Sequence, residues 1–401
     1  METEVKDIKP HSPIRSLERS FSDEQLSKEF DQELVAALVG MSPTFIRKVI
    51  GKRSKDPIPL QDVLILLEQD SFSETFVPRS KVPSYLLGLD MEEEGSLEID
   101  DRHTFLQGDA RALIRRLPAS SVQSVVTSTP YWGLRLYDTH FSVEWADGET
   151  CPFGHEQTPE SFIRHTIEIL FYLKRALKEE GSIWWNLMDT YNTRTQIRSN
   201  ASETLNAMQG NDSRSWSDYE CRRYSAGHSY LEDGELCLIP NRVAERASRI
   251  GYWAKSMITW KKDGSLPEPV RTRATREGEY ILHLSLKRGP YFDKDAFHRL
   301  PTRLGGRYAK YEAEKMTDIW CFPTADGKDD HGAAFPIALP GRCIGLTSQK
   351  DDVVLDPFVG SGTTSIAAHK LGRRSLGFDV DEEYLDTARS RLKGKPMHLE
   401  L

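Results

Sequence analysis

Apolar residues recur at helical spacing between residues 26 and 70. The residues of the first such group are Leu34, Val35, Leu38 and Val39. This spacing predicts a short helix, because residues three and four positions apart lie on one helical face. Gly40 then permits a tight turn, and Ser42 followed by Pro43 is a signal for the start of a second helix. A third helix is expected over residues 60–68.

The two helices around Gly40 can be interpreted in two ways. With Ala36 before the turn and Ile46 after it, the layout resembles a helix-turn-helix, in which a small residue lets the helices cross closely and the second helix enters a groove of DNA. Nearby basic side chains favour this interpretation, namely Arg47, Lys48, Lys52, Arg53 and Lys55. The alternative is a small helical packing module that does not touch DNA.

Polar segments mark the boundaries of this module. Residues 1–25 are polar and lack hydrophobic periodicity, which predicts a disordered tail. An all-helical module is then expected over 26–90. The acidic run at 91–101 predicts the boundary that follows it. A large domain is expected over residues 100–396.

Strand-length and helix-length apolar patterns alternate in the large domain. The expected strands are 124–127, 182–187, 280–286, 353–356 and 375–379, and the expected helices are 162–177, 242–251, 363–372 and 382–392. Such alternation predicts an α/β fold with a mostly parallel, doubly wound sheet whose two faces are covered by helices. The polar stretch at about 191–235 lacks periodicity, so we expect an inserted loop on one rim of the sheet.

The composition is that of an ordinary globular protein. Hydrophobic residues make up 38% and charged residues 28% of the chain, and no apolar run approaches the roughly 18 residues of a membrane span. The polar first residues carry no apolar stretch of the kind a secretory signal needs, so we expect a cytoplasmic protein with no membrane partner. The net charge of −8 argues against a general polyanion binder, and any DNA-binding surface must therefore be local.

The cysteines are expected to be free thiols. They are Cys151, Cys221, Cys237, Cys321 and Cys343. Their number is odd and none is spaced as CxxC, which argues against a disulfide framework or a zinc ribbon. Cys151 and His155 could form half of a metal site, but two ligands do not hold zinc. We therefore expect no metal.

The strongest local motif is a glycine-rich turn between a strand and a helix. The strand ends at Asp356, and Gly360 and Gly362 let a ligand approach the backbone. The helix that follows offers free N–H groups to a carboxylate. Asp379 stands about 20 residues later, the usual place for an acid that binds ribose hydroxyls. The motif suits a nucleoside-like ligand; taken alone, it could also be a structural turn or an ordinary nucleotide site.

A second motif lies where an apolar strand runs into the sequence STPYW. Pro130 stiffens the turn, and Tyr131 and Trp132 offer rings for stacking beside the small polar Ser128. A base extruded from a duplex needs that combination, because stacking of about 1 to 3 kcal/mol per base offsets part of the cost of flipping it. Without the first motif, this stretch could equally be a turn in the core.

Together the two motifs resemble the amino-methyltransferases of DNA, in the permuted class whose catalytic turn precedes the cofactor loop. The matching segments, in the family's order, are FLQGDARALIRRLP, VTSTPYWGLR, SIWWNLMDTYN, the stretch from ELCLIPNRVAERASRIGYW to EGEYILHL, IWCFPTADGKDDHGAAFP and DVVLDPFVGSGTT. The resemblance covers about residues 103–392. It implies a Rossmann-like methyltransferase fold with S-adenosyl-L-methionine as cofactor.

The resemblance also implies the site residues. The catalytic residues are Ser128, Thr129, Pro130 and Tyr131. The cofactor-binding residues are Asp109, which contacts the adenine in the family, His331, Phe335 and Pro336 of an HxAxFP pattern, and Asp356, Phe358, Gly360, Gly362, Thr363 and Asp379. One residue departs from the family, because Thr129 stands where a second proline is usual. Its backbone carbonyl can still accept a hydrogen bond from the target amine, although an inactive site is the competing interpretation.

The implied reaction is direct attack of an exocyclic amine on the sulfonium methyl group. Ser128 is expected to bind the amine or the ring edge, the Thr129 carbonyl to accept an amine hydrogen, and Tyr131 to stack on the base. Serine at the first position favours cytosine N4, with adenine N6 as the second choice. Candidate readers of the DNA sequence are the 191–235 insertion and five basic residues of segment 287–330, namely Arg299, Arg303, Arg307, Lys310 and Lys315.

The expected partner is double-stranded DNA. The sequence does not tell whether a cognate restriction endonuclease accompanies the chain, and such an endonuclease is not expected to be a stable partner. The chain is expected to be a monomer or a homodimer. A competing hypothesis is a DNA-binding regulator that uses residues 26–55 while a weakened methyltransferase site merely holds cofactor.

Overall fold

The computed structural model describes most of the chain, in two compact units. The described residues are 20–51, 56–89, 97–99, 101–132, 141–192, 231–232, 234–263, 271–323 and 335–393. The small unit comprises Met1–Asp90 with Arg249–Gly251, and the large unit comprises Met91–Ser248 with Tyr252–Leu401. No helix among the described residues is both long enough and apolar enough to cross a membrane.

The small unit is built mainly from short helices. Its elements are α2 (Asp23–Ser27), β1 (Glu29–Phe30), α3 (Gln32–Val39), α4 (Pro43–Ile50), β2 (Ile58–Pro59), α5 (Leu60–Leu67), η1 (Arg79–Lys81) and α6 (Val82–Gly88). The predicted turn between α3 and α4 is confirmed, since Gly40 has φ +66° and a Cβ there would lie 2.2 Å from the Ser73 carbonyl oxygen. Ser42 caps α4 by accepting a hydrogen bond of 3.2 Å from the Phe45 N–H.

Two expectations for the small unit were wrong in detail. Helix α2 lies partly within the expected tail, because Ser22 and Gln25 form a reciprocal capping box. The unit is also not all-helical, because β1 and β2 pair antiparallel, Phe30 with Ile58. Pro59 disfavours helical conformation at the residue before it, so Ile58 stays extended and joins this ladder.

The large unit contains one sheet of eight strands. Their order is β10 (Ile319–Pro323), β8 (Trp253–Asp263), β9 (Gly278–Ser285), β7 (Leu177–Leu187), β4 (Val122–Ser128), β11 (Val353–Asp356), β12 (Arg374–Asp379) and β3 (His103–Gln107). Strand β9 pairs antiparallel with both of its neighbours, and every other pairing in the sheet is parallel. The prediction of a mostly parallel sheet is therefore confirmed.

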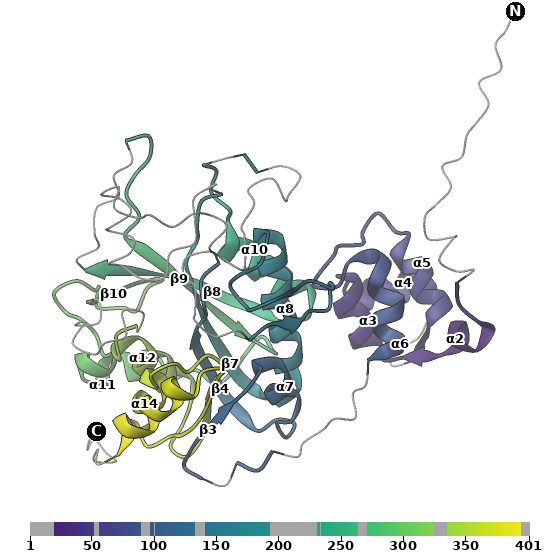
Figure 1. Ribbon diagram of the computed structural model, residues 1–401. Coiled ribbons are helices and arrows are strands. Elements are labelled where there is room, and N and C mark those ends of the chain that lie inside the picture. Colours follow the sequence, from purple (N-terminus) through teal and green to yellow (C-terminus); the bar gives the residue numbers. More distant parts are fainter. Residues whose placement is uncertain are drawn as a thin grey trace, which may run out of the picture. The chain divides into compact units, whose positions relative to one another are not determined.

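Helices cover both faces of this sheet. Figure 1 shows α7 (Ala110–Arg115), α8 (Pro159–Ala176) and α10 (Ile239–Arg249) on one side, and α12 (Ala338–Thr347) and α14 (Glu382–Leu392) on the other. The remaining elements of the unit are the hairpin strands β5 (Val143–Glu144) and β6 (Thr150–Cys151), and the helices α11 (Ala296–Arg299), η3 (Thr302–Leu304) and α13 (Thr363–Lys370). The expected α/β arrangement is confirmed.

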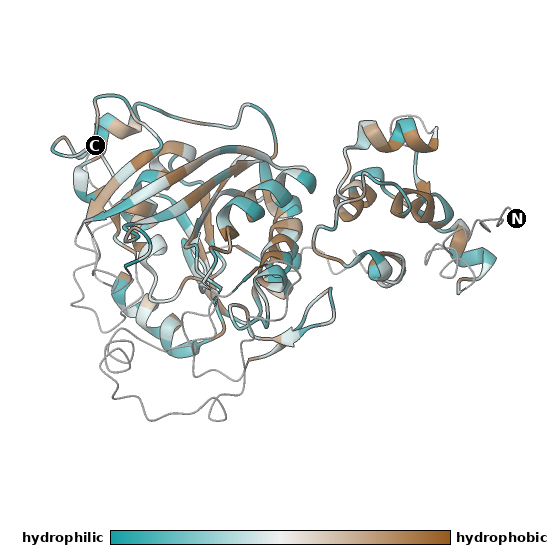
Figure 2. Ribbon diagram, turned by 90° about the horizontal axis from the view of Figure 1, so that it is seen from above, coloured by the Kyte–Doolittle hydropathy of each residue, from teal (hydrophilic) through white to brown (hydrophobic). Residues whose placement is uncertain are grey.

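A buried apolar core holds the sheet and its helices together. Many apolar segments lie along the strands and helices of the large unit (Figure 2). Trp184, Trp260 and Trp320 come from three strands and are each no more than 3% exposed. The Trp184 indole N–H donates to Thr347 Oγ1 at 3.0 Å, which ties β7 to α12. Burial of each such side chain contributes on the order of 2 kcal/mol, so this layer fixes which helix packs on which strand.

Two predicted helices begin three residues earlier than expected. The helix expected over 162–177 spans Pro159–Ala176, and the helix expected over 242–251 spans Ile239–Arg249. The first turn of α10 is capped from a distance, because Asp189, just after β7, accepts the Ile239 N–H at 3.0 Å. Local sequence carries no sign of a cap that lies 50 residues away. The 191–235 insertion lies almost entirely outside the described residues, and Tyr191 bridges to Leu236 across its base.

Candidate active site

Two turns far apart in sequence meet at the carboxyl ends of β4 and β11, which are adjacent parallel strands. Thr127 Oγ1, on β4, donates to Asp356 Oδ1 at 2.7 Å. Thr364 Oγ1, on α13, donates to Asp356 Oδ2 at 2.6 Å. Asp356 is 2% exposed, so it is a buried clamp between the two turns and has little surface to offer a ligand.

The turn after β4 carries the four expected catalytic residues. Ser128 is the last residue of β4, and its Oγ lies 3.3 Å from Tyr131 Oη. Thr129 is 4% exposed, and its Oγ1 has no hydrogen-bond partner among the described residues. Pro130 and Tyr131 are half-buried. The turn therefore presents Ser128 and Tyr131 together and turns Thr129 inward.

Three residues that sequence reasoning missed complete this turn. Asn186 Nδ2, on β7, donates to Tyr131 Oη at 2.7 Å and to Ser128 Oγ at 3.3 Å. It also donates to Glu279 Oε2, on β9, at 2.8 Å. Tyr131 Oη donates to the same Glu279 oxygen, and Lys262 forms an ion pair with the other. Nothing local marked these residues, since a polar residue at a strand end is ordinary.

The turn after β11 provides the expected cofactor-side backbone. Gly360 has φ +47°, and a Cβ built there would meet nothing within 4 Å, so open space adjoins this backbone. Gly362 caps α13 with φ +83°, and a Cβ there would lie 2.7 Å from Ala388 Cβ. Helix α13 begins at Thr363. Any other residue at position 362 would be strained, because φ is positive there and its Cβ would meet Ala388. A side chain at position 360 would fill part of the open space beside the backbone.

Asp379 lies at the carboxyl end of β12, next to the glycine turn. Its Oδ2 accepts the Gly360 N–H at 2.9 Å and its Oδ1 accepts the Asp381 N–H at 3.0 Å. Burial raises the pKa of Asp379 to about 6, and burial likewise raises that of Asp356 to about 6. At neutral pH the Asp379 carboxylate is therefore largely charged, beside open space, and able to accept hydrogen bonds from hydroxyl groups.

The remaining expected cofactor residues fall into three situations. Asp109 is the N-cap of α7, where it accepts hydrogen bonds from the backbone N–H and the side chain of Arg111 at 3.1 and 3.2 Å. Gly108, just before it, donates to the Asp379 carbonyl at 2.9 Å, which brings Asp109 to the same edge of the sheet. Phe335 packs against the core, and Pro336 is buried. His331 lies outside the described residues.

A segment behind the two turns, residues 141–157, braces both of them. Its Glu156 carbonyl accepts the Trp132 indole N–H at 2.8 Å. Its Phe153 ring stacks on Phe358 of the glycine turn, with centroids 5.2 Å apart. A Cβ at Gly154 would lie 3.0 Å from Pro130 Cβ. The segment, which we call the brace, therefore fixes the spacing of the two turns from one side.

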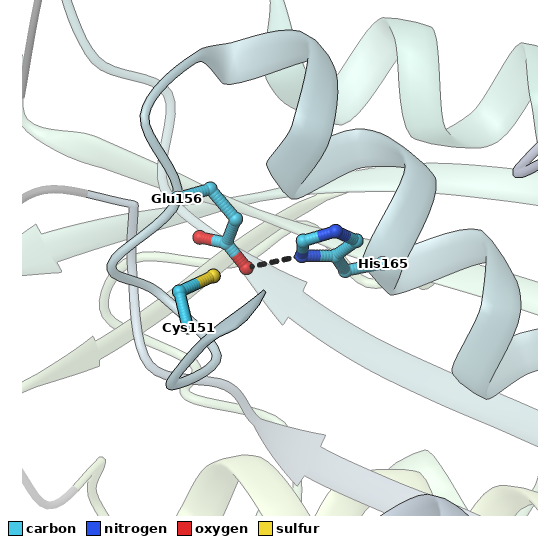
Figure 3. Close-up of side chains that lie close together, drawn as sticks. All are labelled: Cys151, Glu156 and His165. Atoms are coloured by element: carbon cyan, nitrogen blue, oxygen red, sulfur yellow. Dashed lines mark hydrogen bonds and ion pairs between the residues drawn. The ribbon is translucent and has the colours of Figure 1, made fainter. Parts of the chain in front are cut away.

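The brace is attached to α8 by a buried charge cluster. Figure 3 shows Cys151, Glu156 and His165 side by side, with His165 Nδ1 3.0 Å from a Glu156 oxygen. His165 Nε2 lies 3.2 Å from Asp147 Oδ1. Burial by itself would lower the pKa of His165, but the hydrogen bonds and charges of Asp147 and Glu156 outweigh it and raise that pKa to about 9.

Both ring nitrogens of His165 have an acidic partner. The Cys151, Glu156 and His165 donor atoms lie within 4.8 Å of one another, a spacing that a metal ion could bridge. Glu156 and Asp147 each lie within hydrogen-bond distance of one ring nitrogen, and both favour the protonated form of the histidine. From the sequence we considered Cys151 and His155 as half of a metal site, whereas the structure places Cys151 beside Glu156 and His165.

The five basic residues expected to read DNA are spread over a surface segment. Arg299 forms an ion pair with Asp293, and Arg307 forms one of 2.5 Å with Glu314. Arg303 and Lys315 are exposed, and the Lys310 ammonium lies 5.1 Å from the centroid of the Tyr311 ring. A contact of any of them with a base stays a prediction.

The comparisons with known proteins define the class of this chain. The family model described as a DNA methylase, that of the N6 and N4 methyltransferases, matches residues 122–390. The chain belongs to this family of DNA methyltransferases. S-adenosylmethionine is the methyl donor of the family and is therefore the cofactor of this chain.

Individual relatives agree with this class. The type II methyltransferase M.Cfr9I of Citrobacter freundii is 29% identical over 319 residues, which cover 80% of this chain and 97% of the relative. M.XycI of Xanthomonas campestris pv. cyanopsidis is 30% identical over 292 residues, covering 73% and 88%. M.ScaI of Streptomyces caespitosus is 45% identical over 206 residues, covering 46% and 67%.

The solved structure of a DNA methyltransferase is similar in fold to this chain. The PvuII DNA methyltransferase, described as cytosine-N4-specific, has a TM-score of 0.50 to this chain at 16% sequence identity. The match covers 76% of this chain and 90% of that one. At this identity the likeness concerns the fold alone.

Proposed function

We propose that this chain transfers a methyl group from S-adenosylmethionine to the exocyclic N4 of cytosine in double-stranded DNA. The observation that carries the proposal is the hydrogen bond between Thr127 and Asp356, 2.7 Å long, which joins the Ser128 turn to the glycine turn. Two bound reactants must be held in line for direct transfer, and such positioning accounts for about 7 to 11 kcal/mol of a barrier. Adjacent turns, one for each reactant, provide that positioning.

The glycine turn suits the cofactor. When bound, S-adenosylmethionine supplies an electrophilic methyl group. The cofactor would lie in the open space beside the Gly360 backbone, and the Asp379 carboxylate would accept hydrogen bonds from the ribose of the cofactor. Asp109, Phe335, Pro336, Phe358, Gly362 and Thr363 would complete the cofactor site, with Asp356 acting as the clamp beneath it. His331 is assigned by its place in the HxAxFP pattern.

The Ser128 turn suits the target base. Ser128 Oγ would contact the amine, the Thr129 carbonyl would accept an amine hydrogen, and the half-buried Tyr131 ring would stack on the flipped base. Pro130 would keep the turn rigid. Cytosine N4 is preferred to adenine N6 because serine is the first residue of this turn.

The cellular role follows from the type II relatives. We expect the chain to be the modification enzyme of a restriction-modification system, acting in the cytoplasm as a monomer or homodimer. A cognate endonuclease would recognise the same DNA sequence without forming a stable complex with this chain.

The test is methyl transfer from radiolabelled S-adenosylmethionine to mixed-sequence duplex DNA, followed by digestion to nucleosides and mass spectrometry. The natural chain should yield N4-methyldeoxycytidine, and Ser128→Ala should lose at least about 100-fold in rate, as expected for a group that assists proton transfer. If the product is N6-methyldeoxyadenosine, the target is adenine N6 and the assignment to cytosine N4 is wrong. No transfer to any such DNA would overturn the enzyme assignment.

A second candidate, a DNA-binding regulator with a weakened site, is favoured by one observation. Helices α3 and α4 of the small unit are joined at Gly40, and α4 exposes Lys48 and Phe45. Binding of the chain to specific DNA without any methyl transfer would support this candidate. Methyl transfer that requires Ser128 would exclude it.

A further inference from the structure

A chain of hydrogen bonds leads from Ser128 to a buried carboxylate. Ser128 Oγ lies 3.3 Å from Tyr131 Oη, and Tyr131 Oη donates to Glu279 Oε2. These three residues come from β4, the turn after it, and β9, so only the folded sheet brings them together. Sequence position 279 is 148 residues from Tyr131.

Glu279 and Asn186 set the direction of these hydrogen bonds. A carboxylate oxygen only accepts, so the Tyr131 hydrogen points to Glu279 Oε2. Asn186 Nδ2 donates to Tyr131 Oη at 2.7 Å and occupies one lone pair of that oxygen. Tyr131 Oη keeps a second lone pair, which can accept the Ser128 hydrogen. Every donor in the series therefore points away from the target base and toward Glu279.

Glu279 is a costly residue to bury. It is 4% exposed, and its carboxylate is balanced by Lys262, whose side chain is 25% exposed. Replacing a buried ion pair by apolar residues is often neutral or stabilising, so stability alone does not explain a carboxylate at this position. A buried carboxylate beside a catalytic turn points to a role in the reaction.

We propose that Glu279 is a positioning residue that acts through Tyr131 and finally accepts the proton released by the methylated amine. The inference rests on the proposed contact between Ser128 and the amine. As the bond from nitrogen to the methyl carbon forms, the carbon–sulfur bond breaks and its electron pair stays on sulfur. The amine proton passes to Ser128 Oγ, the Ser128 hydrogen to Tyr131 Oη, and the Tyr131 hydrogen to Glu279 Oε2. Glu279 returns the proton to solvent between turnovers.

The experiment measures the single-turnover rate of methyl transfer to duplex DNA at saturating cofactor. Glu279→Gln preserves size and can still accept the tyrosine hydrogen bond, but it cannot take up a proton. Tyr131→Phe keeps the stacking ring and removes the middle hydroxyl. Each variant should be slower by roughly 10- to 100-fold, with the dissociation constants of DNA and S-adenosylmethionine unchanged. The double variant should be no slower than the slower single variant, because both break one pathway.

The controls separate a relay from a structural role. Glu180→Gln changes an exposed glutamate on β7 that pairs with Lys287, and it should keep the natural rate. If Glu279→Ala is slow while Glu279→Gln is as fast as the natural chain, the carboxylate only orients Tyr131 and the relay is wrong. If the rate losses of Glu279→Gln and Tyr131→Phe multiply in the double variant, the two residues act independently and the relay is also wrong.

Three further results keep the inference distinct from the proposed function. If Glu279→Gln does not fold, Tyr131→Phe alone decides, and a natural rate in that variant overturns the relay. A natural rate in Ser128→Ala would instead overturn the contact between Ser128 and the amine. An inactive Ser128→Ala together with a fully active Glu279→Gln would overturn the relay alone.

Discussion

At the scale of single residues, Thr129 is the feature that sets this chain apart from the usual catalytic turn. It stands where the family has a second proline, and its side chain is buried without a hydrogen-bond partner among the described residues. A buried hydroxyl left unpaired costs about 1 to 3 kcal/mol. The role proposed for Thr129 uses its backbone carbonyl, which any residue supplies.

Thr129→Val should therefore keep methyl transfer and gain stability. The change replaces the unpaired hydroxyl by a methyl group of similar size, so the free energy of unfolding should rise by roughly 1 kcal/mol. Urea unfolding and the single-turnover rate measure the two effects. The matched control is Thr127→Val, which removes the hydrogen bond to Asp356 and should lower both stability and rate. Loss of transfer in Thr129→Val would show that the hydroxyl itself takes part.

At the scale of elements, charged and aromatic side chains together join the brace to α8. Trp145 of the brace stacks on the His165 ring with centroids 4.1 Å apart, and the Arg111 guanidinium lies 4.1 Å from the centroid of the same indole. Arg111 in turn donates to Glu168 of α8 at 2.7 Å. Cations beside an aromatic ring and between carboxylates are stabilised, so this junction depends on the charge of His165.

The stability of the large unit should consequently fall as pH rises from about 6.5 to about 9. The pKa of His165 is raised in the folded chain to about 9 from 6.5, so its contribution is complete below pH 6.5 and is lost as the pH passes 9. The loss is on the order of 3 kcal/mol at most. Burial lowers the pKa of His103 to about 4 and that of His283 to about 3, so both titrate below this range.

Urea unfolding at several pH values, for the natural chain and for His165→Gln, measures this dependence. The glutamine variant should be less stable at pH 6.5, and its stability should change less between pH 6.5 and 9. Parallel curves for the two chains would contradict a cationic His165.

At the scale of the whole molecule, charge limits where DNA can bind. The net charge is −8, so the DNA phosphates must meet a local basic surface. Helix α4 of the small unit is one candidate, since Arg47 is held by Gln32 and Thr44 while Lys48 is exposed. In the alternative interpretation, the small unit is a packing module that does not touch DNA. Measurement of DNA affinity distinguishes the DNA-binding interpretation from the packing interpretation.

Lys48→Ala should weaken DNA binding if α4 contacts phosphate. Removing one phosphate contact should reduce the slope of log affinity against log salt concentration by about 0.9. Fluorescence anisotropy of labelled duplex DNA at several salt concentrations gives this slope. The matched control is Lys350→Ala, an exposed lysine before β11, at the edge of the sheet opposite the two turns. Equal slopes for Lys48→Ala and the natural chain would leave α4 as packing surface.

Features that depend on near neighbours along the chain could be predicted from the sequence. Alternating apolar patterns predicted the α/β fold, because strand and helix periodicities are local properties of the chain. The glycine turn and the STPY turn were also visible, since the residues that shape a turn lie within it. Their place in one site followed from the family order, and the structure brings them together through Thr127 and Asp356.

Features that depend on side chains brought together by folding could not be predicted from the sequence. Asp189 starts α10 from 50 residues away, Glu279 holds Tyr131 from 148 residues away, and His165 gains its charge from carboxylates on the brace. A side chain's hydrogen bonds and pKa are set by the groups that packing places around it. The sequence does not tell which groups packing will place there, so the cap, the relay and the charge cluster emerged only with the fold.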